Sequence, residues 1–301
     1  MSRAPEPEVF APLEEVLRER KALVERALRA AAPAGESREV LEAAHGSLFA
    51  PAKRMRPILS LLVAEVLGGD KQALLPAAAA IEMVHTSSLI LDDLPSMDDA
   101  RERRGRPACH VASGEATAIL AAFALLNRAY EILAEGWPGG PELAARSQMA
   151  RDLAQAVGIT GMIAGQARDL AMTGHVIDLA TLEFIHSRKT GALFIAAAAL
   201  GAEGARAPAP ARAAVLAYAK NLGLAFQIVD DLIDATGEAA EAGKDVGQDR
   251  RKTTFVSFAG VAGARQLAAE LIEASQESLT PFGAAAQPLR DLARYVVTRR
   301  R

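Results

Sequence analysis

The residues with the clearest chemical potential are two clusters of aspartates set in otherwise apolar, alanine-rich sequence. The first is Asp92-Asp93-Leu-Pro-Ser-Met-Asp98-Asp99, and the second is Asp230-Asp231-Leu-Ile-Asp234. Carboxylates repel one another and resist leaving water, so apolar surroundings require a compensating positive charge. Oxygen ligands without His or Cys beside them favour hard cations, and Mg²⁺ commonly combines a few carboxylates with water and substrate phosphate. The clusters therefore predict a site for Mg²⁺ and diphosphate between two facing segments.

The second cluster has the spacing of one face of a helix. Gln227, Asp230, Asp231 and Asp234 fall at positions i, i+3, i+4 and i+7, which align along one side of an α-helix. A short stripe of acids on a helix is usually just a solvated surface. The apolar setting, the glutamine on the same stripe and the partner cluster upstream favour a functional interpretation.

The first cluster needs a break in its helix to act as one site. Asp92 and Asp98 are six residues apart, which on a straight helix places them on different faces. Pro95 lies between them and is expected to break or distort the helix, so that the extra turn returns Asp98 to the side of Asp92. Arg103 and Arg104 follow and offer planar donor groups suited to phosphate oxygens, although an isolated pair would more often form surface ion pairs.

Further basic residues stand in otherwise uncharged contexts along the chain. Each alone is consistent with a solvated loop charge, but together they would form the cationic rim that two diphosphate groups require. His85 precedes Asp92 by two helical turns and is a candidate phosphate donor, with a satisfied core histidine as the ordinary alternative. The residues of the rim are Lys53, Arg56, Lys189 with the adjacent Thr190, and Lys244.

The composition of the chain limits its fold and its partners. Its 301 residues carry a formal net charge of −3, and 50% are hydrophobic but only 4% aromatic. The high apolar content supports a sizeable core, and the low aromatic content favours helix over sheet. The slightly negative net charge gives no sign of a basic surface for nucleic acid. The single Cys109 cannot form an internal disulfide, which fits a reducing cytosol, so we expect a cytoplasmic protein. The longest uncharged stretch near the middle, residues 190–202, is too short to span a bilayer, so no membrane insertion is expected.

The periodicity of the chain predicts an all-α protein. Leu13, Val16 and Leu17 begin a pattern of apolar residues at helical spacing, and segments rich in glycine and proline punctuate the rest. No alternating strand or interdomain linker is evident, so we expect a single many-helix domain over residues 1–301, with a flexible N terminus at 1–8. Residues 116–126 and 193–200 are apolar on nearly every face, which predicts a place at the centre of a helical bundle or along a cavity.

Five motifs, in this order and spacing, together resemble the trans (E-type) polyprenyl diphosphate synthases. The aspartate clusters lie in residues 81–99, which run on to Arg103-Arg104-Gly105, and in residues 223–234. The basic motifs are residues 53–57, Lys189-Thr190-Gly191 and Gly243-Lys244-Asp245. Either aspartate cluster alone would be a weak signal, whereas the five together are specific and cover nearly all of the chain after about residue 40.

The resemblance implies an isoprenoid synthase type of fold, a helical bundle around a deep central cavity, assembled as a homodimer. It also implies a head-to-tail (1′–4) condensation of isopentenyl diphosphate with allylic diphosphates and three Mg²⁺ ions per active site. By the same resemblance, the metal ions would be held by Asp92, Asp98 and Asp230, with support from Asp93, Asp231 and Asp234. The allylic diphosphate would contact Arg103, Lys189, Gln227 and Lys244, with Thr190 sheltering the carbocation. The isopentenyl diphosphate would contact Lys53, Arg56, His85 and Arg104.

Product length in the family that the chain resembles follows from the residues just before the first aspartate cluster. Here Ser87 and Ser88 are small, and their surroundings look most like bacterial geranylgeranyl diphosphate synthases, so we expect a C20 product. Farnesyl diphosphate (C15) is the alternative, because Phe123 or another bulky residue could form a shallower floor. Ala52 stands where the family usually has a glycine, which could weaken isopentenyl diphosphate binding.

Two other functions are compatible with parts of the sequence. A terpene cyclase pairs an acidic motif with an Asn/Asp-xxx-Ser/Thr-xxx-Glu metal motif, which the register of Asn221, Ala225 and Val229 lacks. A non-catalytic subunit of a heteromeric synthase typically lacks metal ligands in one or both clusters, and this chain keeps both. A catalytic prenyltransferase is therefore the favoured interpretation.

Overall fold

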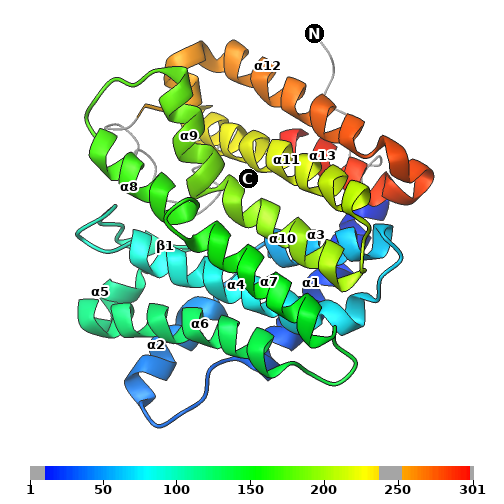
Figure 1. The fold of residues 1–301 in the computed structure, drawn as a ribbon. Helices are drawn as coiled ribbons and strands as arrows, with labels where there is room; N and C mark the ends of the chain where they lie inside the picture. The colour runs from blue at the N-terminus through cyan, green and yellow to red at the C-terminus, as the bar shows by residue number, and fades with distance from the viewer. Residues whose placement is uncertain (1–10, 237–252, 299–301) are drawn as a thin grey trace.

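The computed structural model describes residues 11–236 and 253–298, which are almost entirely helical (Figure 1). The predicted all-α fold is confirmed, while the N-terminal segment 1–8 lies outside the described residues. A short hairpin, which the sequence did not predict, joins strands β1 (Glu102–Arg103) and β2 (Arg106–Pro107). The helices are α1 (Ala11–Ala31), α2 (Arg38–Leu48), α3 (Met55–Val66), α4 (Lys71–Asp92), α5 (Cys109–Ser113), α6 (Glu115–Glu135), α7 (Leu143–Val157), α8 (Met162–Met172), α9 (Leu179–Lys189), α10 (Gly191–Gly204), α11 (Ala209–Thr236), α12 (Phe255–Ser278), the 3₁₀ helix η4 (Thr280–Ala286) and α13 (Gln287–Thr298).

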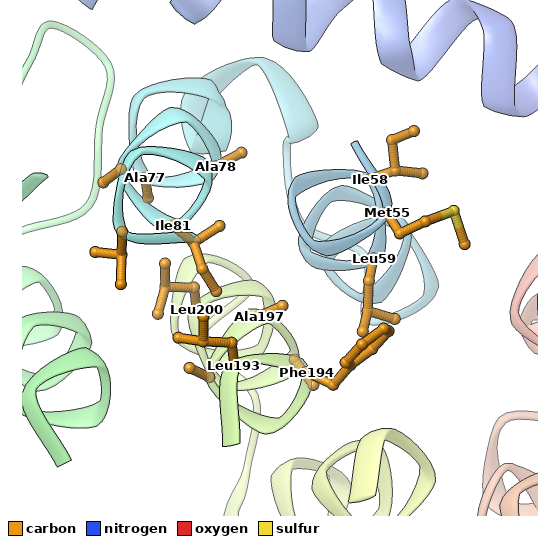
Figure 2. Close-up of a cluster of buried hydrophobic side chains, with 14 of the residues drawn as sticks. Met55, Ile58, Leu59, Ala77, Ala78, Ile81, Leu193, Phe194, Ala197 and Leu200 are labelled. Carbon is orange, nitrogen blue, oxygen red and sulfur yellow. The ribbon is translucent and has the colours of Figure 1, made fainter. Parts of the chain in front are cut away.

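The centre of the core is formed by α3, α4 and α10, which are rich in alanine and aliphatic residues. Small residues let these helices approach closely, since a Cβ atom on Gly201 of α10 would lie only 2.5 Å from the Ser60 carbonyl oxygen of α3. Figure 2 shows Ile81 of α4 pointing toward α10, and Leu59 of α3 lying beside Phe194 of α10. The prediction that residues 193–200 form a buried central helix is confirmed.

The apolar segment at residues 116–126 behaves differently from this central helix. Within α6, Ala118, Ala122 and Leu125 are buried, and the helix packs on α2 and α4. Leu120 and Phe123 are instead 55% and 60% exposed. Apolar composition does not specify on which sides a helix finds neighbours, so α6 keeps an uncovered apolar face in the described chain.

Three of the described helices, α4, α6 and α12, are long and apolar enough to cross a membrane by length and composition alone. Each of the three contains isolated charged residues, so none is a continuous uncharged stretch. Of their most apolar windows, 67% in α4, 39% in α6 and 22% in α12 is buried inside the protein. The core therefore uses most of the apolar surface of α4, and the absence of membrane insertion stays a prediction.

The packing of the long helices brings the two aspartate clusters to the same end of the bundle. α4 packs against α3, α6 and α10, while α11 packs against α10 and α12. Figure 1 shows the C-terminal ends of α4 and α11 at one end of the molecule, with α8 and α9 beside them. The first cluster begins at Asp92, the last residue of α4, and the second lies in the last turns of α11. Both clusters are therefore located at this end of the bundle.

Candidate active site

A cavity of about 1220 Å³ opens between α3, α4, α8, α9, α10 and α11, and its wall includes most of the residues singled out in the sequence. Among the described residues, the predicted site residues that line it are Lys53, Arg56, His85, Ser88, Asp92, Asp98, Arg103, Arg104, Lys189, Thr190, Gln227, Asp230, Asp231 and Asp234. Lys244 lies outside the described residues. Segments far apart in the sequence thus contribute acids and bases to one cavity, and it is large enough for an extended ligand.

The break predicted at Pro95 has the expected geometric effect. α4 ends at Asp92, and the following turn folds back so that the Asp98 backbone N–H donates to the Asp92 carbonyl oxygen at 3.0 Å. The Lys189 Nζ atom lies 3.2 Å from Asp92 Oδ1 and 3.9 Å from Asp98 Oδ2. The turn therefore brings the two carboxylates to the same side, where one ammonium group reaches both.

Asp93 has a different position from its neighbour Asp92. The residue is 2% exposed and does not line the large cavity, and its carboxylate accepts hydrogen bonds from Arg103 Nε at 2.9 Å and from the same guanidinium's NH2 group. Burial raises the pKa of Asp93, and the Arg103 charge opposes that rise. At the end of α4 its carboxylate binds Arg103 and does not line the cavity, and a supporting role at a metal ion stays a prediction.

The unpredicted hairpin positions both arginines of the first motif. Its two central residues, Arg104 and Gly105, have φ angles of 58° and 69°, as a two-residue turn between right-twisted strands requires. Burial lowers the pKa of Arg103, but the Asp93 carboxylate outweighs this and raises it, so the guanidinium stays charged. The Arg-Gly pair in the sequence was the available signal for this turn.

Two site residues on α8 were missed by the sequence reasoning. Gln166 Nε2 donates to Asp92 Oδ1 at 2.6 Å, and Lys189 Nζ donates to Asp169 Oδ2 at 2.9 Å. Their i, i+3 spacing places both on one helix face, which was a usable but weak signal. Gly165 makes their approach possible, because a Cβ atom there would lie 2.3 Å from the Lys189 backbone nitrogen.

The second cluster is tied to the break between α9 and α10 by a chain of hydrogen bonds. The Thr190 hydroxyl donates to Gln227 Oε1 at 2.9 Å, and Gln227 Nε2 donates to Asp231 Oδ1 at 2.9 Å. The other Asp231 oxygen accepts from the Phe255 backbone N–H at 3.0 Å, at the start of α12. Asp231 is 4% exposed and binds Gln227, and it lines the cavity together with Asp230 and Asp234, as the helical spacing predicted.

A second group of basic residues lies on α3 and α4. Arg56 NH1 donates to His85 Nε2 at 3.1 Å, and its guanidinium stacks 4.8 Å from the Phe194 ring centroid. Burial lowers the pKa of Arg56 to about 10 and the pKa of His85 well below its usual value, with nearby arginines adding to the effect on His85. His85 is therefore neutral near pH 7, and since Arg56 can only donate, the imidazole proton sits on Nδ1.

The three residues expected to form the floor of the cavity are not equivalent. Ser88 lines the cavity, whereas the Ser87 hydroxyl is buried and donates to the Ala122 carbonyl oxygen of α6 at 2.8 Å. Phe123 is 60% exposed on the outer face of α6. Ser87 and Phe123 of the same chain are not among the residues that line the cavity, because successive residues on a helix point in different directions, and the floor assignment stays a prediction.

The aspartates fit Mg²⁺ in sites completed by a substrate rather than by protein alone. Within residues 11–236 and 253–298, no three His, Cys, Asp or Glu side chains gather closely enough to hold an ion by themselves. Mg²⁺ needs only one or two carboxylates when phosphate oxygens and water complete its shell. Asp92 and Asp98 adjoin each other, Asp230 lines the cavity from α11, and the nearby Lys189 ammonium shows that positive charge is accommodated there.

Comparisons with known proteins agree with this geometry. A family model described as "Polyprenyl synthetase" matches residues 38–280. A geranylgeranyl diphosphate synthase of Cyanophora paradoxa is 41% identical over 286 residues, covering 94% of this chain and 95% of that protein. A farnesyl diphosphate synthase of Haemophilus influenzae is 42% identical over 269 residues, covering 87% and 89%. The apo crystal structure of an FPP/GFPP synthase from Zymomonas mobilis is similar with a TM-score of 0.84 and 36% identity, covering 95% of this chain and 99% of that one.

Proposed function

Because the chain belongs to the polyprenyl synthetase family, and is a polyprenyl diphosphate synthase acting on isoprenyl diphosphates, we propose a specific reaction for it. It condenses isopentenyl diphosphate head to tail with allylic diphosphates, and its end product is geranylgeranyl diphosphate (C20). Family membership implies Mg²⁺ as the cofactor, and the number of ions, three per site, belongs to the proposal.

The observation that carries the proposal is the joining of acids and bases in one cavity. Asp92 and Asp98 lie at the end of α4, Asp230 lies on α11, and Lys189 reaches the first pair. Carboxylates from two helices in one cavity are suited to bind metal ions that neutralise a multiply charged ligand. The guanidinium groups of Arg103 and Arg104 are suited to bind phosphate oxygens. The same cavity also contains apolar residues such as Leu89, Leu193 and Phe226, which suit a hydrocarbon chain.

The residues of the cavity support a stepwise assignment of the chemistry. The C–O bond of the allylic diphosphate breaks, diphosphate leaves with the electron pair, and the Lys189 and Arg103 cations stabilise the charge that develops on it. Bound Mg²⁺ supplies additional positive charge to the leaving group. The Thr190 and Gln227 oxygens place dipoles near the allylic cation.

The second substrate completes the reaction. We assign the isopentenyl diphosphate group to Lys53, Arg56, His85 and Arg104, which line the same cavity. The double bond of isopentenyl diphosphate attacks the allylic carbon and forms the new C–C bond. The released diphosphate then takes the proton that restores a double bond, so no further cofactor is needed.

The C20 product is the finer part of the proposal. Ser88 is the small residue that lines the cavity just before the first aspartate cluster, which leaves room for a long chain. The relatives include both a geranylgeranyl and a farnesyl diphosphate synthase at similar identity, so their names do not separate C20 from C15. A farnesyl product remains the alternative.

We also propose that the protein is a cytoplasmic homodimer. The uncovered face of α6 carries Ile119, Leu120 and Phe123, which are 37%, 55% and 60% exposed. A contiguous apolar helix face of this kind is typical of a protein–protein interface. Sedimentation of the purified protein tests the assembly, and replacing Leu120 and Phe123 by charged residues should give monomers.

The reaction is tested by incubating purified protein with Mg²⁺, labelled isopentenyl diphosphate and one of dimethylallyl, geranyl or farnesyl diphosphate. Products are dephosphorylated and sized by chromatography. A C20 alcohol from all three primers is the expected result. A C15 end point would keep the condensation and reject the C20 assignment, and no elongation by folded protein would contradict the proposal as a whole.

A further inference from the structure

A buried carboxylate lies between two arginines beside the cavity and has no part in the chemistry assigned so far. Glu82 of α4 is 1% exposed and precedes His85 by one helical turn. Its Oε1 atom accepts from Arg54 NH1 at 2.7 Å and lies 4.0 Å from Arg104 NH2. A buried carboxylate persists only with charged partners, so this position is built around the two guanidinium groups.

Arg54 connects Glu82 to the loop between α2 and α3. Its side chain is fully buried, and its NH2 group donates to the Leu48 carbonyl oxygen at 2.6 Å while Nε donates to Glu25 at 2.8 Å. Arg54 also has a φ angle of 56°, a left-handed conformation that is unusual for a residue with a side chain. These contacts hold the loop in place, and the loop presents Lys53 to the cavity.

Arg104 connects the same carboxylate to the hairpin. Burial lowers the pKa of Arg104, and the Glu82 charge opposes this more than any other group. Burial likewise lowers the pKa of Arg56, again with Glu82 as the main opposing charge. One carboxylate thus contacts Arg54 at the start of α3 and lies near Arg104 of the hairpin, two segments far apart in the sequence.

We infer that Glu82 is a positioning residue for the second diphosphate: it orients Arg54, and through it the loop bearing Lys53, together with Arg104. This inference rests on the proposed function, because Lys53 and Arg104 are assigned there to isopentenyl diphosphate. Whether removal of the Glu82 charge strengthens or weakens diphosphate binding distinguishes a positioning role from a simple charge effect. Removal of a negative charge near a phosphate site would strengthen binding if charge alone mattered, whereas loss of orientation weakens it.

The test uses Glu82→Gln, which keeps the shape of the side chain and removes its charge. We expect the KM for isopentenyl diphosphate to rise about tenfold or more, as for loss of a charge-assisted contact, while the KM for geranyl diphosphate changes less than about twofold. Glu25→Gln is the matched control, since Glu25 also binds Arg54 but is 26% exposed in its side chain and does not approach Arg104. Its effect on the KM for isopentenyl diphosphate should be less than about threefold.

Three results would overturn the inference: a KM for isopentenyl diphosphate that falls or stays constant, equal effects of Glu82→Gln and Glu25→Gln, or equal losses for both substrates. Thermal unfolding shows whether each variant is folded. If Glu82→Gln does not fold, Glu82→Asp keeps the charge but withdraws it from both arginines, and the same selective rise in KM is expected. A wild-type protein that elongates no primer would instead contradict the proposed function, which separates the two failures.

Discussion

The Asp231 carboxylate accepts a hydrogen bond from Gln227 Nε2 at 2.9 Å, so it sets the orientation of the amide whose oxygen accepts from Thr190. Asp231 therefore fixes Gln227 in addition to lining the cavity, and its supporting role at a metal ion stays a prediction.

Replacing Asp231 by Ala should lower kcat about 10- to 100-fold with a smaller change in KM, because the Gln227 dipole is no longer held toward the developing cation. The free energy of unfolding should also fall by about 1–3 kcal/mol, since the Phe255 backbone N–H loses its acceptor. Steady-state kinetics and urea unfolding measure both effects. In a double variant with Gln227→Ala the kinetic losses should not add, and full additivity would show that Asp231 acts independently of Gln227.

Asp92→Asn and Asp93→Asn should impair the enzyme in different ways. Asp92 lines the cavity, so its variant should raise the Mg²⁺ concentration needed for half-maximal activity about tenfold or more. Asp93 binds Arg103, so its variant should chiefly raise the KM for the allylic diphosphate. Activity titrated against free Mg²⁺ after treatment with a chelator, which should abolish activity in the wild type, distinguishes the two. Equal shifts in the Mg²⁺ requirement would argue that Asp93 is itself a metal ligand.

Gly165→Ala should disturb the site without touching a charged residue. The added Cβ atom would lie 2.3 Å from the Lys189 backbone nitrogen, so α8 and the end of α9 must move apart. Overpacking of this kind costs about 1–3 kcal/mol of stability, and we expect kcat/KM to fall about tenfold or more as Lys189 shifts. Gly46→Ala in α2 is the control, since apart from its chain neighbours and the backbone of its own helix no atom lies within 4 Å of the added Cβ. The unfolding free energy of the Gly46→Ala protein should stay constant or rise. An unchanged kcat/KM in the Gly165→Ala protein would show that Lys189 tolerates the shift.

Ser88→Tyr should shorten the product, because the new ring enters the cavity from α4. Ser87→Tyr should instead lower the free energy of unfolding by about 1–3 kcal/mol, since the buried Ser87 side chain contacts the backbone of α6. Chromatography of dephosphorylated products and thermal unfolding give the two readouts. A shortened product from folded Ser87→Tyr, with Ser88→Tyr unaffected, would place the floor on the α6 side.

The stability of the protein should fall in acid partly because of His85. Burial lowers its folded-state pKa below the unfolded value of about 6.5, so between those values the unfolded state binds more protons. Stability contributed by the neutral imidazole is therefore present above pH 6.5 and is lost as the pH falls below it, by about 1.4 kcal/mol per pH unit until the folded-state pKa is reached. Urea unfolding at pH 7 and pH 5.5 should show a smaller loss for His85→Gln than for the wild type, and identical losses would mean that His85 is not the group responsible.

Local spacing along the chain was sufficient for the features that depend on one helix. Apolar residues at a period of 3.6 predict the helices, the i, i+3, i+4, i+7 pattern places Asp230 and Asp234 on one face, and Pro95 predicts the turn that returns Asp98 to Asp92. These features require no knowledge of neighbouring helices. The ordered motifs also identified the family, since the types and spacing of the reactive residues follow from the chemistry that they perform.

The tertiary structure decided which side chains face the cavity and which face another helix. Asp93 and Ser87 each adjoin a cavity residue in sequence but point elsewhere, because the rotation of α4 is set by packing against α3, α6 and α10. The contacts of Gln166 with Asp92 and of Glu82 with Arg54 join segments that only the packed bundle brings together. Such pairings depend on the summed burial of many apolar residues along whole helices, which no short stretch of sequence encodes.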